Sequence, residues 1–233
     1  MKDISITSVE GFLSKLNVFA EFDFFRGHSS IDYKLIPSIG RFYRDGQDSG
    51  LLQFEKDIFE DFERKYSLFT DVRPRNDMEF LFLAQHYGLP TRLLDWTFNP
   101  LIALYFACVS NPDKDGAVYH CITLNPLYIF DPAKDNIFSF QHLTMLRPNL
   151  TDVRYKNQNG LFLLYPKPWQ EDLSFVQERF IIPARAKKSI LTKLEKIGIT
   201  RSFIMPSLDS LCTEILALHE KRYPFLNFSI ARD

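Results

Sequence analysis

The sequence predicts an α+β fold: a single domain with a mixed, mostly antiparallel sheet as its core and helices flanking it. Short apolar segments typical of buried strands alternate, at unequal spacing, with longer segments of helical periodicity. The hydrophobic fraction of 45% and the 23 phenylalanines are sufficient for a large aromatic core. No linker divides the 233 residues. We therefore expect one domain over residues 1–233, with an N-terminal helical segment at 1–20 and a C-terminal helical segment at 185–233.

Composition narrows the possible partners. The formal net charge of −1 gives no global attraction to nucleic acid or to an anionic membrane. The three cysteines form no C-x-x-C pair and the five histidines show no helical pairing, so we expect free thiols and no metal. The first residues lack the apolar run of a signal peptide, and no segment is long enough to span a bilayer. These features favour a soluble cytoplasmic protein with no membrane partner.

Helices are expected where apolar residues recur at helical spacing and a capping residue precedes them. They are predicted over residues 4–19 after a cap at Thr7 or Ser8, 51–66, 77–86 with Asp77 as cap and Gly88 as stop, 100–110 after Asn99, 186–197 before Gly198, and from Ser207 onward. Strands are predicted at 22–28, 117–124, 152–165, 175–182 and 203–205. Residues 91–97 are expected to form a short polar crossing, and residues 125–149 a loop.

The stretch from Leu83 to Ala107 places polar residues between two apolar helices. We expect a site there, because rigid helices can hold reactive groups in place. Its candidates are His86, Tyr87, Arg92, Asp95 and Trp96. Structural alternatives remain open for them. Asp95 could simply pair with Arg92, His86 could be a hydrogen-bonded structural histidine, and Trp96 could belong to the core.

Further candidates come from other segments. Arg26 follows a strand rich in phenylalanine, and the adjacent Gly27 permits a sharp turn or a close approach of another backbone. A guanidinium there could bind the phosphate or carboxylate of a ligand. It could instead pair with a structural carboxylate of the protein. Arg154 and Gln158 stand just before another apolar strand. Arg26, Arg92 and Arg154 could together bind a pyrophosphate, with Trp96 or Tyr87 against a ring.

Several motifs resemble the FRG domain family. They are Phe25–Gly27, Ala84–Gly88, Pro90–Thr97, Asn99–Pro100 and Ala103–Ala107, and the similarity continues at Arg154, Gln158, Gly160, Phe162, 197–199 and 206–209. The resemblance covers nearly the whole chain. It also draws attention to Glu55, although the acidic residues of the 51–66 helix are expected to form mostly a solvated face.

The order of motifs is also similar to that of ADP-ribosyltransferases. This resemblance implies that Arg26 holds the phosphate or ribose of NAD and that Thr97 lies on the middle strand, followed by Ala103 and 106–107. The third position, which hydrogen-bonds ribose and stabilises an oxocarbenium-like transition state, would be Gln158 or Glu178. Trp96-Thr97 replaces the family's Ser-Thr-Ser run. If Gln158 takes the third position, no carboxylate is available, whereas Glu178 would preserve it.

The sequence therefore favours a nucleotide- or NAD-directed enzyme with NAD as cofactor. Its predicted catalytic residues are Arg26, His86, Asp95, Gln158 and Glu178, and its predicted ligand-binding residues are Gly27, Tyr87, Arg92, Trp96, Thr97 and Arg154. A non-enzymatic sensing or protein-interaction module is the alternative, with an exposed apolar face in the aromatic loop 127–140. A nucleic-acid-acting domain is disfavoured by the net charge.

Overall fold

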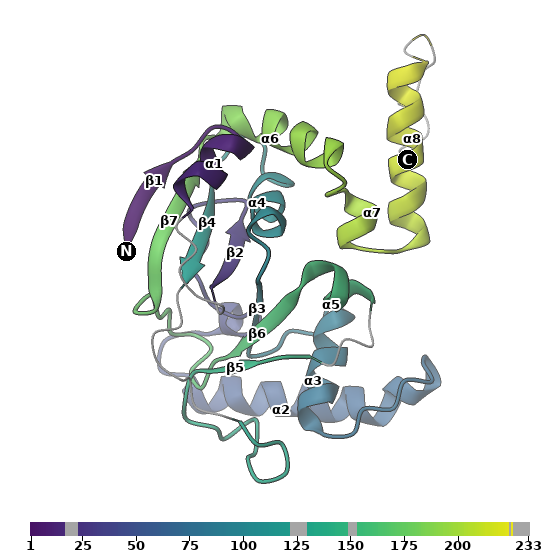
Figure 1. Ribbon diagram of the computed structural model, residues 1–233. Helices are drawn as coiled ribbons and strands as arrows, with labels where there is room; N and C mark the ends of the chain where they lie inside the picture. The colour runs from purple at the N-terminus through teal and green to yellow at the C-terminus, as the bar shows by residue number, and fades with distance from the viewer. Residues whose placement is uncertain (17–22, 122–129, 149–152, 224, 226–233) are drawn as a thin grey trace.

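The computed structural model describes residues 1–16, 23–121, 130–148, 153–223 and 225. Its centre is a seven-stranded sheet with the strand order β1-β7-β4-β2-β3-β6-β5 (Figure 1). The strands are β1 Lys2–Ser5, β2 Phe24–His28, β3 Leu93–Thr97, β4 Gly116–Cys121, β5 Thr144–Leu146, β6 Gly160–Leu164 and β7 Val176–Ile182. β1 runs parallel to β7, and every other neighbouring pair is antiparallel. The predicted α+β fold with a mixed, mostly antiparallel sheet is confirmed.

Helices pack on the sheet and project from one end of it. They are α1 Val9–Lys15, α2 Asp48–Lys65, α3 Asp77–His86, α4 Pro100–Cys108, α5 Val153–Gln158, α6 Ala184–Lys196, α7 Arg201–Ile204 and α8 Leu208–Arg222, with 3₁₀ turns at Ile39–Phe42 and Tyr66–Leu68. Several predicted ends are correct: Ser8, Asn99 and Ser207 cap their helices, and Gly88 and Gly198 have φ values of +92° and +87°. Asn76 caps α3 in place of the predicted Asp77.

Two helical layers cover different halves of one sheet face. Helices α1, α4 and α6 pack on the half formed by β1, β7, β4 and β2. Helices α2 and α3 contribute to a second cluster with β3, β5 and β6. The opposite face buries the alternate residues of the same strands, among them Phe24, Trp96 and Leu163. The boundary between the two helical layers therefore falls at β2 and β3.

Helix α4 lies directly on the backbone of β2. A Cβ atom at Gly27 would come within 1.9 Å of the Ala103 carbonyl oxygen and 2.7 Å of the Ala107 nitrogen. Ala103 and Ala107 are four residues apart and thus share one face of α4. A Cβ at Gly116 would likewise meet the Ala107 carbonyl at 2.3 Å. Gly27 in β2, with Ala103 and Ala107 in α4, thus allows the helix to lie close against the sheet. Of the two roles considered for Gly27, the close approach of another backbone is the one observed.

Five sequence expectations are wrong in the local structure. The first residues form β1 instead of a helix, because Lys2–Ser5 pair with the edge of β7 and the salt bridge between Asp3 and Arg179 supports that pairing. The predicted crossing at 91–97 is mostly β3, an inner strand. The strand predicted at 152–165 begins, in its described part, with α5; residues 203 and 204 of the strand predicted at 203–205 lie in α7; and the described part of the loop 125–149 contains β5. In the last two cases a short element depends on contacts with distant residues, which local periodicity does not record. Phe22, in the strand predicted at 22–28, lies outside the described residues.

Candidate functional site

The sheet is held together weakly at β2 and β3. Among the described residues, the ladder between these strands contains the single pair Phe25–Thr97. Next to that pair the Arg26 side chain crosses from β2 to β3, and its Nη1 donates to the Asp95 carbonyl oxygen. A guanidinium thus satisfies a main-chain acceptor that a regular ladder would have paired with a backbone N–H.

A cavity of about 150 Å³ lies at this separation. It is lined by residues of β2, β3, α4 and α5: Phe25, Arg26, Gly27, Asp95, Trp96, Thr97, Ile102, Phe106 and Gln158. Six of these are predicted site residues, namely Arg26, Gly27, Asp95, Trp96, Thr97 and Gln158. The structure therefore brings the two main motif regions and the late Gln158 to one place. Ile102 was not predicted, and Phe106 was named only as part of the motif that follows Thr97, because α4 is apolar on nearly all sides and its sequence does not indicate which face is exposed to a cavity.

Arg26 is the main charged group of the cavity. Its side chain is 16% exposed, and its Nε donates to His28 Nε2 at 2.9 Å. Burial lowers the pKa of Arg26, the Asp95 carboxylate opposes that shift, and the positive charge of Arg41 adds to it. Burial, followed by the charge of Arg26, lowers the pKa of His28 to about 3, so His28 is a neutral acceptor at pH 7. Burial is thus the main influence on Arg26, and the nearby charges of Asp95 and Arg41 act in opposite directions.

Asp95 supplies a carboxylate that is still open to solvent. Its side chain is 58% exposed, and its Oδ2 lies 3.9 Å from Arg26 Nη1, at the limit of an ion pair. Its strand neighbours Leu94 and Trp96 are buried on the other face of β3. The pairing with Arg92 considered from the sequence is wrong, because Arg92 binds elsewhere. Asp95 is therefore available to a ligand.

Thr97 and Gln158 form a hydrogen-bonded wall of the cavity. Thr97 Oγ1 donates to the Gln158 carbonyl oxygen at 2.6 Å and accepts from the Asn99 N–H at 2.9 Å. Gln158 Nε2 donates to the Ile204 carbonyl oxygen at 3.0 Å. These bonds connect β3, the start of α4, α5 and α7. The side-chain amide of Gln158 thus already has a structural partner.

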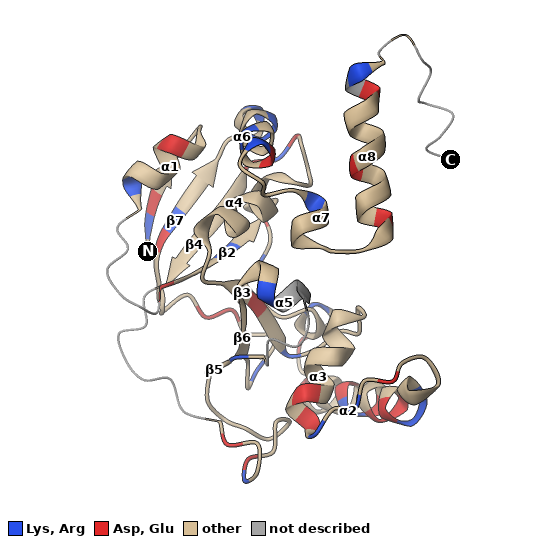
Figure 2. Ribbon diagram, turned by 45° about the vertical axis from the view of Figure 1, so that its right-hand side comes forward, with Lys and Arg blue, Asp and Glu red and all other residues tan. Residues whose placement is uncertain are grey.

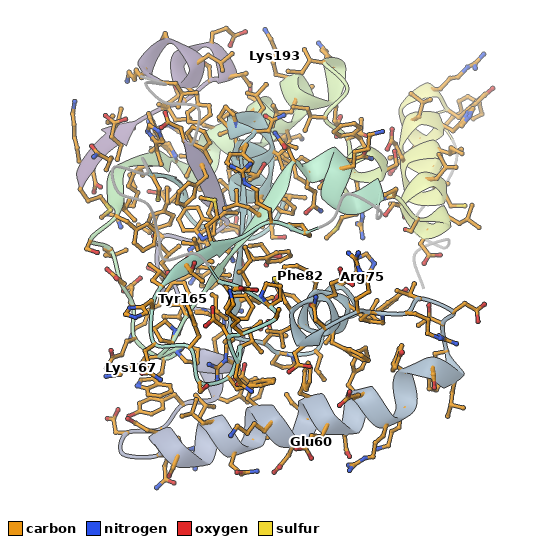
Figure 3. All side chains as sticks on the ribbon, turned by 60° about the horizontal axis from the view of Figure 1, so that its bottom comes forward. Glu60, Arg75, Phe82, Tyr165, Lys167 and Lys193 are labelled. Atoms are coloured by element: carbon orange, nitrogen blue, oxygen red, sulfur yellow. The ribbon has the colours of Figure 1, made fainter. Side chains whose placement is uncertain are left out.

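Two buried polar atoms lie on the sheet face that Arg26 shares. Trp96 is 3% exposed and meets Phe24 edge-on at 5.1 Å, so its ring belongs to the core, as the structural alternative allowed. Its Nε1 has no hydrogen-bond partner among the described residues, and neither does the Oη of Tyr165, which is 2% exposed (Figure 3). Burial raises the pKa of the Tyr165 hydroxyl, which therefore remains protonated, and the nearby Arg26 opposes that shift. Both groups are donors without an acceptor, a costly state in a protein interior.

Arg92 forms a buried ion pair with Glu55 and does not line the cavity. Its predicted role as a ligand-binding residue is therefore wrong. It is 1% exposed, and so is Glu55 of α2. Arg92 Nε lies 3.0 Å from both carboxylate oxygens of Glu55, Nη2 lies 2.6 Å from Oε2, and the backbone N–H donates to Oε1. Nη1 donates to the carbonyls of Ile137 and Phe138. The guanidinium is fully used, and Glu55 is buried rather than on a solvated face.

Glu178 does not reach the cavity. Glu178 of β7 is paired with His120 of β4, and His120 is paired with Phe25 of β2. Phe25 is paired in turn with Thr97 of β3. Glu178 Oε2 is 3.4 Å from His120 Nδ1, and Asp23 Oδ2 is 3.4 Å from Nε2 of the same ring. Two strands thus separate this carboxylate from β3. The buried His120 was not singled out in the sequence.

The remaining predicted residues are placed elsewhere or are not described. His86 ends α3, and Tyr87 follows it with 65% exposure at a separate apolar groove. The side chain of Arg154 lies outside the described residues, as does part of the aromatic loop 127–140. In the described part of the chain, no group of His, Cys, Asp and Glu could hold a metal ion. None of the described helices is both long and apolar enough to cross a membrane.

Comparison with known proteins identifies one domain. Residues 23–116 match the FRG domain family, and this range contains β2, α2, α3, β3 and α4. No curated protein and no solved structure matches the chain.

Proposed function

From the FRG domain in this chain, we propose a nucleotide-binding function for the cavity between β2 and β3, with NAD as the substrate of a transferase reaction. One observation carries the proposal: Arg26, Asp95, Thr97 and Gln158 come from three separate segments and line one cavity. Convergent polar groups in a largely apolar pocket are typical of small-molecule sites.

Arg26 is assigned to a phosphate. The guanidinium of Arg26 is largely buried at the cavity, and its ion pair with the exposed Asp95 is long, at 3.9 Å, so it remains able to bind an anion. Arginine binds phosphate through charge-assisted hydrogen bonds that neutral ligands cannot match.

Asp95 is assigned to the ribose. It is the carboxylate among the lining residues, whereas Gln158 is neutral and Glu178 lies two strands away. In transfer from NAD, the bond between nicotinamide and the ribose breaks and positive charge develops on the sugar ring. An adjacent carboxylate stabilises that charge. This assignment replaces Gln158 and Glu178 as the stabilising group and retains Arg26 as the anchor.

The size of the cavity limits what it encloses. At about 150 Å³ it is smaller than the roughly 300–1,000 Å³ typical of whole-ligand pockets. It therefore takes one part of a dinucleotide, such as a ribose with its phosphate. The remainder lies across the entrance, where Asp95 is exposed.

The test combines NAD binding, measured by calorimetry, with release of nicotinamide, measured by chromatography. Arg26→Gln should weaken NAD binding by roughly 10- to 100-fold, the worth of a charge-assisted hydrogen bond. Asp95→Asn should keep the melting temperature and lose nicotinamide release. Glu60→Gln, at an exposed position of α2, is the matched control and should change neither (Figure 3).

The outcomes separate the parts of the proposal. If the wild-type protein binds neither NAD nor ADP, the nucleotide assignment is wrong. If NAD binding depends on Arg26 but no acceptor leads to release of nicotinamide, the cavity is a nucleotide-binding site without transferase activity. The protein would then be a nucleotide sensor.

A further inference from the structure

Arg26 and His28 lie on the same side of β2. They are two residues apart in one strand, and alternate residues of a strand share a face. Gly27 between them faces the other way and makes the close contact with α4. Arg26 Nε donates to His28 Nε2 at 2.9 Å, so three consecutive residues place a guanidinium beside its acceptor. The phosphate and ribose assignments above give this histidine no role.

The ring of His28 is held in a fixed place. It is 5% exposed, and it meets the rings of Tyr119 and Tyr33 edge-on, with centroids 5.2 Å and 6.2 Å away. The ladder between β2 and β4 fixes its backbone, because His28 pairs there with Ala117. A side chain that is locked by packing can hold a neighbouring group in one orientation. His28 is therefore a rigid support for Arg26.

His28 accepts from Arg26 without cancelling its charge. Burial, and then the charge of Arg26, lower the pKa of His28 to about 3, so the ring is neutral at pH 7. Because Nε2 accepts from Arg26, the proton of the neutral ring lies on Nδ1. The backbone of Tyr33 favours a proton there without forming a hydrogen bond of ordinary geometry. Charges in protein interiors are usually paired with an opposite charge, whereas this guanidinium has a neutral acceptor at Nε.

The contacts of Arg26 leave part of its guanidinium free. A guanidinium holds its N–H donors in a rigid plane. Nε donates to His28 and Nη1 donates to the Asp95 carbonyl oxygen, whereas Nη2 makes no hydrogen bond to any described residue. Contacts at two different nitrogens fix both the position and the rotation of the plane. Nη2, with both of its N–H groups, is the part left for a ligand.

The cavity contains one basic side chain. Among the described residues that line it, Arg26 is the only Lys or Arg. Figure 2 shows lysines and arginines gathered on α6 instead, where Arg185, Lys188 and Lys196 are exposed. Binding of an anion in the cavity should therefore depend on how well a single guanidinium is oriented, and not on a basic patch.

We propose that His28 is a positioning residue of this site, which holds the Arg26 guanidinium so that Nη2 and the positive charge are left for a phosphate group of the ligand. The proposal rests on the nucleotide-binding function proposed above and adds a reason for the neutral partner. A carboxylate at position 28 would also hold the guanidinium, but it would compete with the phosphate for the positive charge. Substitution can therefore separate position from charge.

The test compares three substitutions of His28 by binding calorimetry with NAD and with inorganic pyrophosphate. The ends of the Gln, Glu and Met side chains stand as many bonds from Cα as His28 Nε2 does. His28→Gln keeps a neutral acceptor and should bind both ligands within about threefold of the wild type. His28→Met removes the acceptor and should weaken both about tenfold, the value of one lost hydrogen bond. His28→Glu adds a charged acceptor and should weaken both at least as much.

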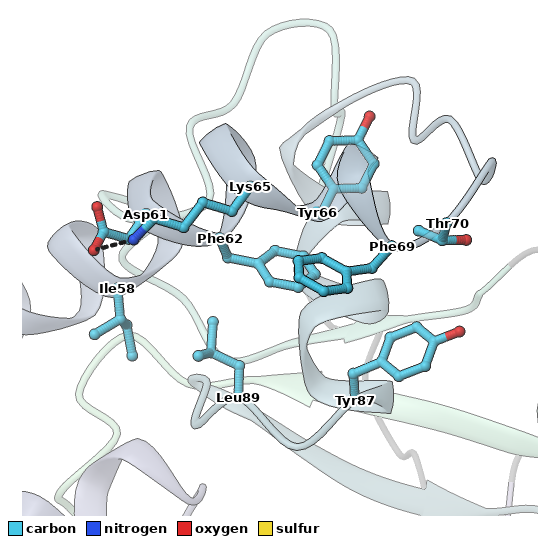
Figure 4. Close-up of a pocket in the computed structure, with 9 residues that line it drawn as sticks. All are labelled: Ile58, Asp61, Phe62, Lys65, Tyr66, Phe69, Thr70, Tyr87 and Leu89. Carbon is cyan, nitrogen blue, oxygen red and sulfur yellow. Dashed lines mark hydrogen bonds and ion pairs between the residues drawn. The ribbon is translucent and has the colours of Figure 1, made fainter.

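A control and two further measurements exclude a merely structural role. Phe69→Ala should leave both affinities unchanged, because Phe69 lines a separate aromatic groove that shares no residue with the cavity (Figure 4). The melting temperature of each variant shows whether affinity simply follows stability. NMR of nitrogen-labelled histidine in the wild-type protein should show a neutral His28 with its proton on Nδ1. A proton on Nε2, or affinities that follow the melting temperatures, would overturn the proposal.

The outcomes also distinguish this proposal from the nucleotide assignment. If pyrophosphate binds with the expected order of variants but NAD does not bind, the nucleotide assignment is wrong and the role of His28 stands. If NAD binding depends on Arg26 but is unchanged in His28→Met and His28→Glu, the role of His28 is wrong and the nucleotide assignment stands. If neither ligand binds, both are wrong.

Discussion

The buried pair of Glu55 and Arg92 joins α2 to the start of β3 within the FRG region, residues 23–116, and provides a test of what holds these two elements together. Both residues are 1% exposed, and Glu55 receives three contacts from the guanidinium and one from the Arg92 backbone N–H. Glu55→Ala removes the partner of a buried charge. Such a loss costs about 3–5 kcal/mol in the free energy of unfolding.

The melting temperature should show this loss clearly. For a chain of this length, 1 kcal/mol corresponds to about 2–4 °C, so Glu55→Ala should lower the melting temperature by roughly 6–20 °C. Glu60→Ala on the exposed side of the same helix should stay within about 0.5 kcal/mol of the wild type. Thermal unfolding followed by circular dichroism gives the melting temperatures, and urea unfolding gives the free energies of unfolding.

A double-mutant cycle separates the pair from its surroundings. Arg92→Met alone leaves a buried carboxylate, whereas Glu55→Leu together with Arg92→Met removes both charges. The double variant still leaves the carbonyls of Ile137 and Phe138 without their donor, so it should not regain wild-type stability. It should, however, lose at least about 2 kcal/mol less than the sum of the single variants. A loss below about 1 kcal/mol for Glu55→Ala, or additive single losses, would refute the reasoning.

Two further results are expected from the region around Arg26. Gly27→Ala should destabilise the protein by about 1–3 kcal/mol in urea unfolding, because its Cβ would stand 1.9 Å from the Ala103 carbonyl, whereas Gly50→Ala, whose Cβ would have ordinary contact at 3.4 Å, should be tolerated. An equal effect at both positions would contradict the close contact of α4 with β2. His28 has a folded-state pKa of about 3 against 6.5 when unfolded, so the unfolded state binds the extra proton between these values and stability should fall as the pH drops from about 6.5 toward 3. His28→Gln should reduce this dependence of the free energy of unfolding on pH, because each unit of pKa shift corresponds to about 1.4 kcal/mol. An unchanged pH dependence would show that His28 is not held neutral.

The sequence predicts elements well where the signal is local. Ser8, Asn99 and Ser207 cap their helices through contacts a few residues away, and Gly88 and Gly198 adopt the positive φ that ends a helix. The sequence misleads where partners are distant. Arg92 and Asp95 made β3 look like a polar crossing, but the acceptor of Arg92 lies 37 residues earlier, on α2.

The candidate site is likewise predictable only where its residues lie in local sequence motifs. Its motifs identify Arg26, Asp95 and Thr97, and the structure places all three around one cavity. The order of the strands in the sheet decides which late polar residue joins them, and that order cannot be read from one strand alone. Glu178 is thus directed toward His120, while Gln158 reaches the cavity from α5.

The order of strands has a consequence for how the FRG region can fold. Residues 23–116 contain β2 and β3 but only the first residue of β4. The long ladders of this sheet join β3 to β6 and β4 to β7, and the partners come from residues 160–164 and 176–182. During synthesis, β3 would leave the ribosome with one edge open until β6 follows more than sixty residues later. The matched range is therefore a segment of a folding unit that extends at least through β7, and a chain shortened to that range would expose unpaired strand edges and aggregate.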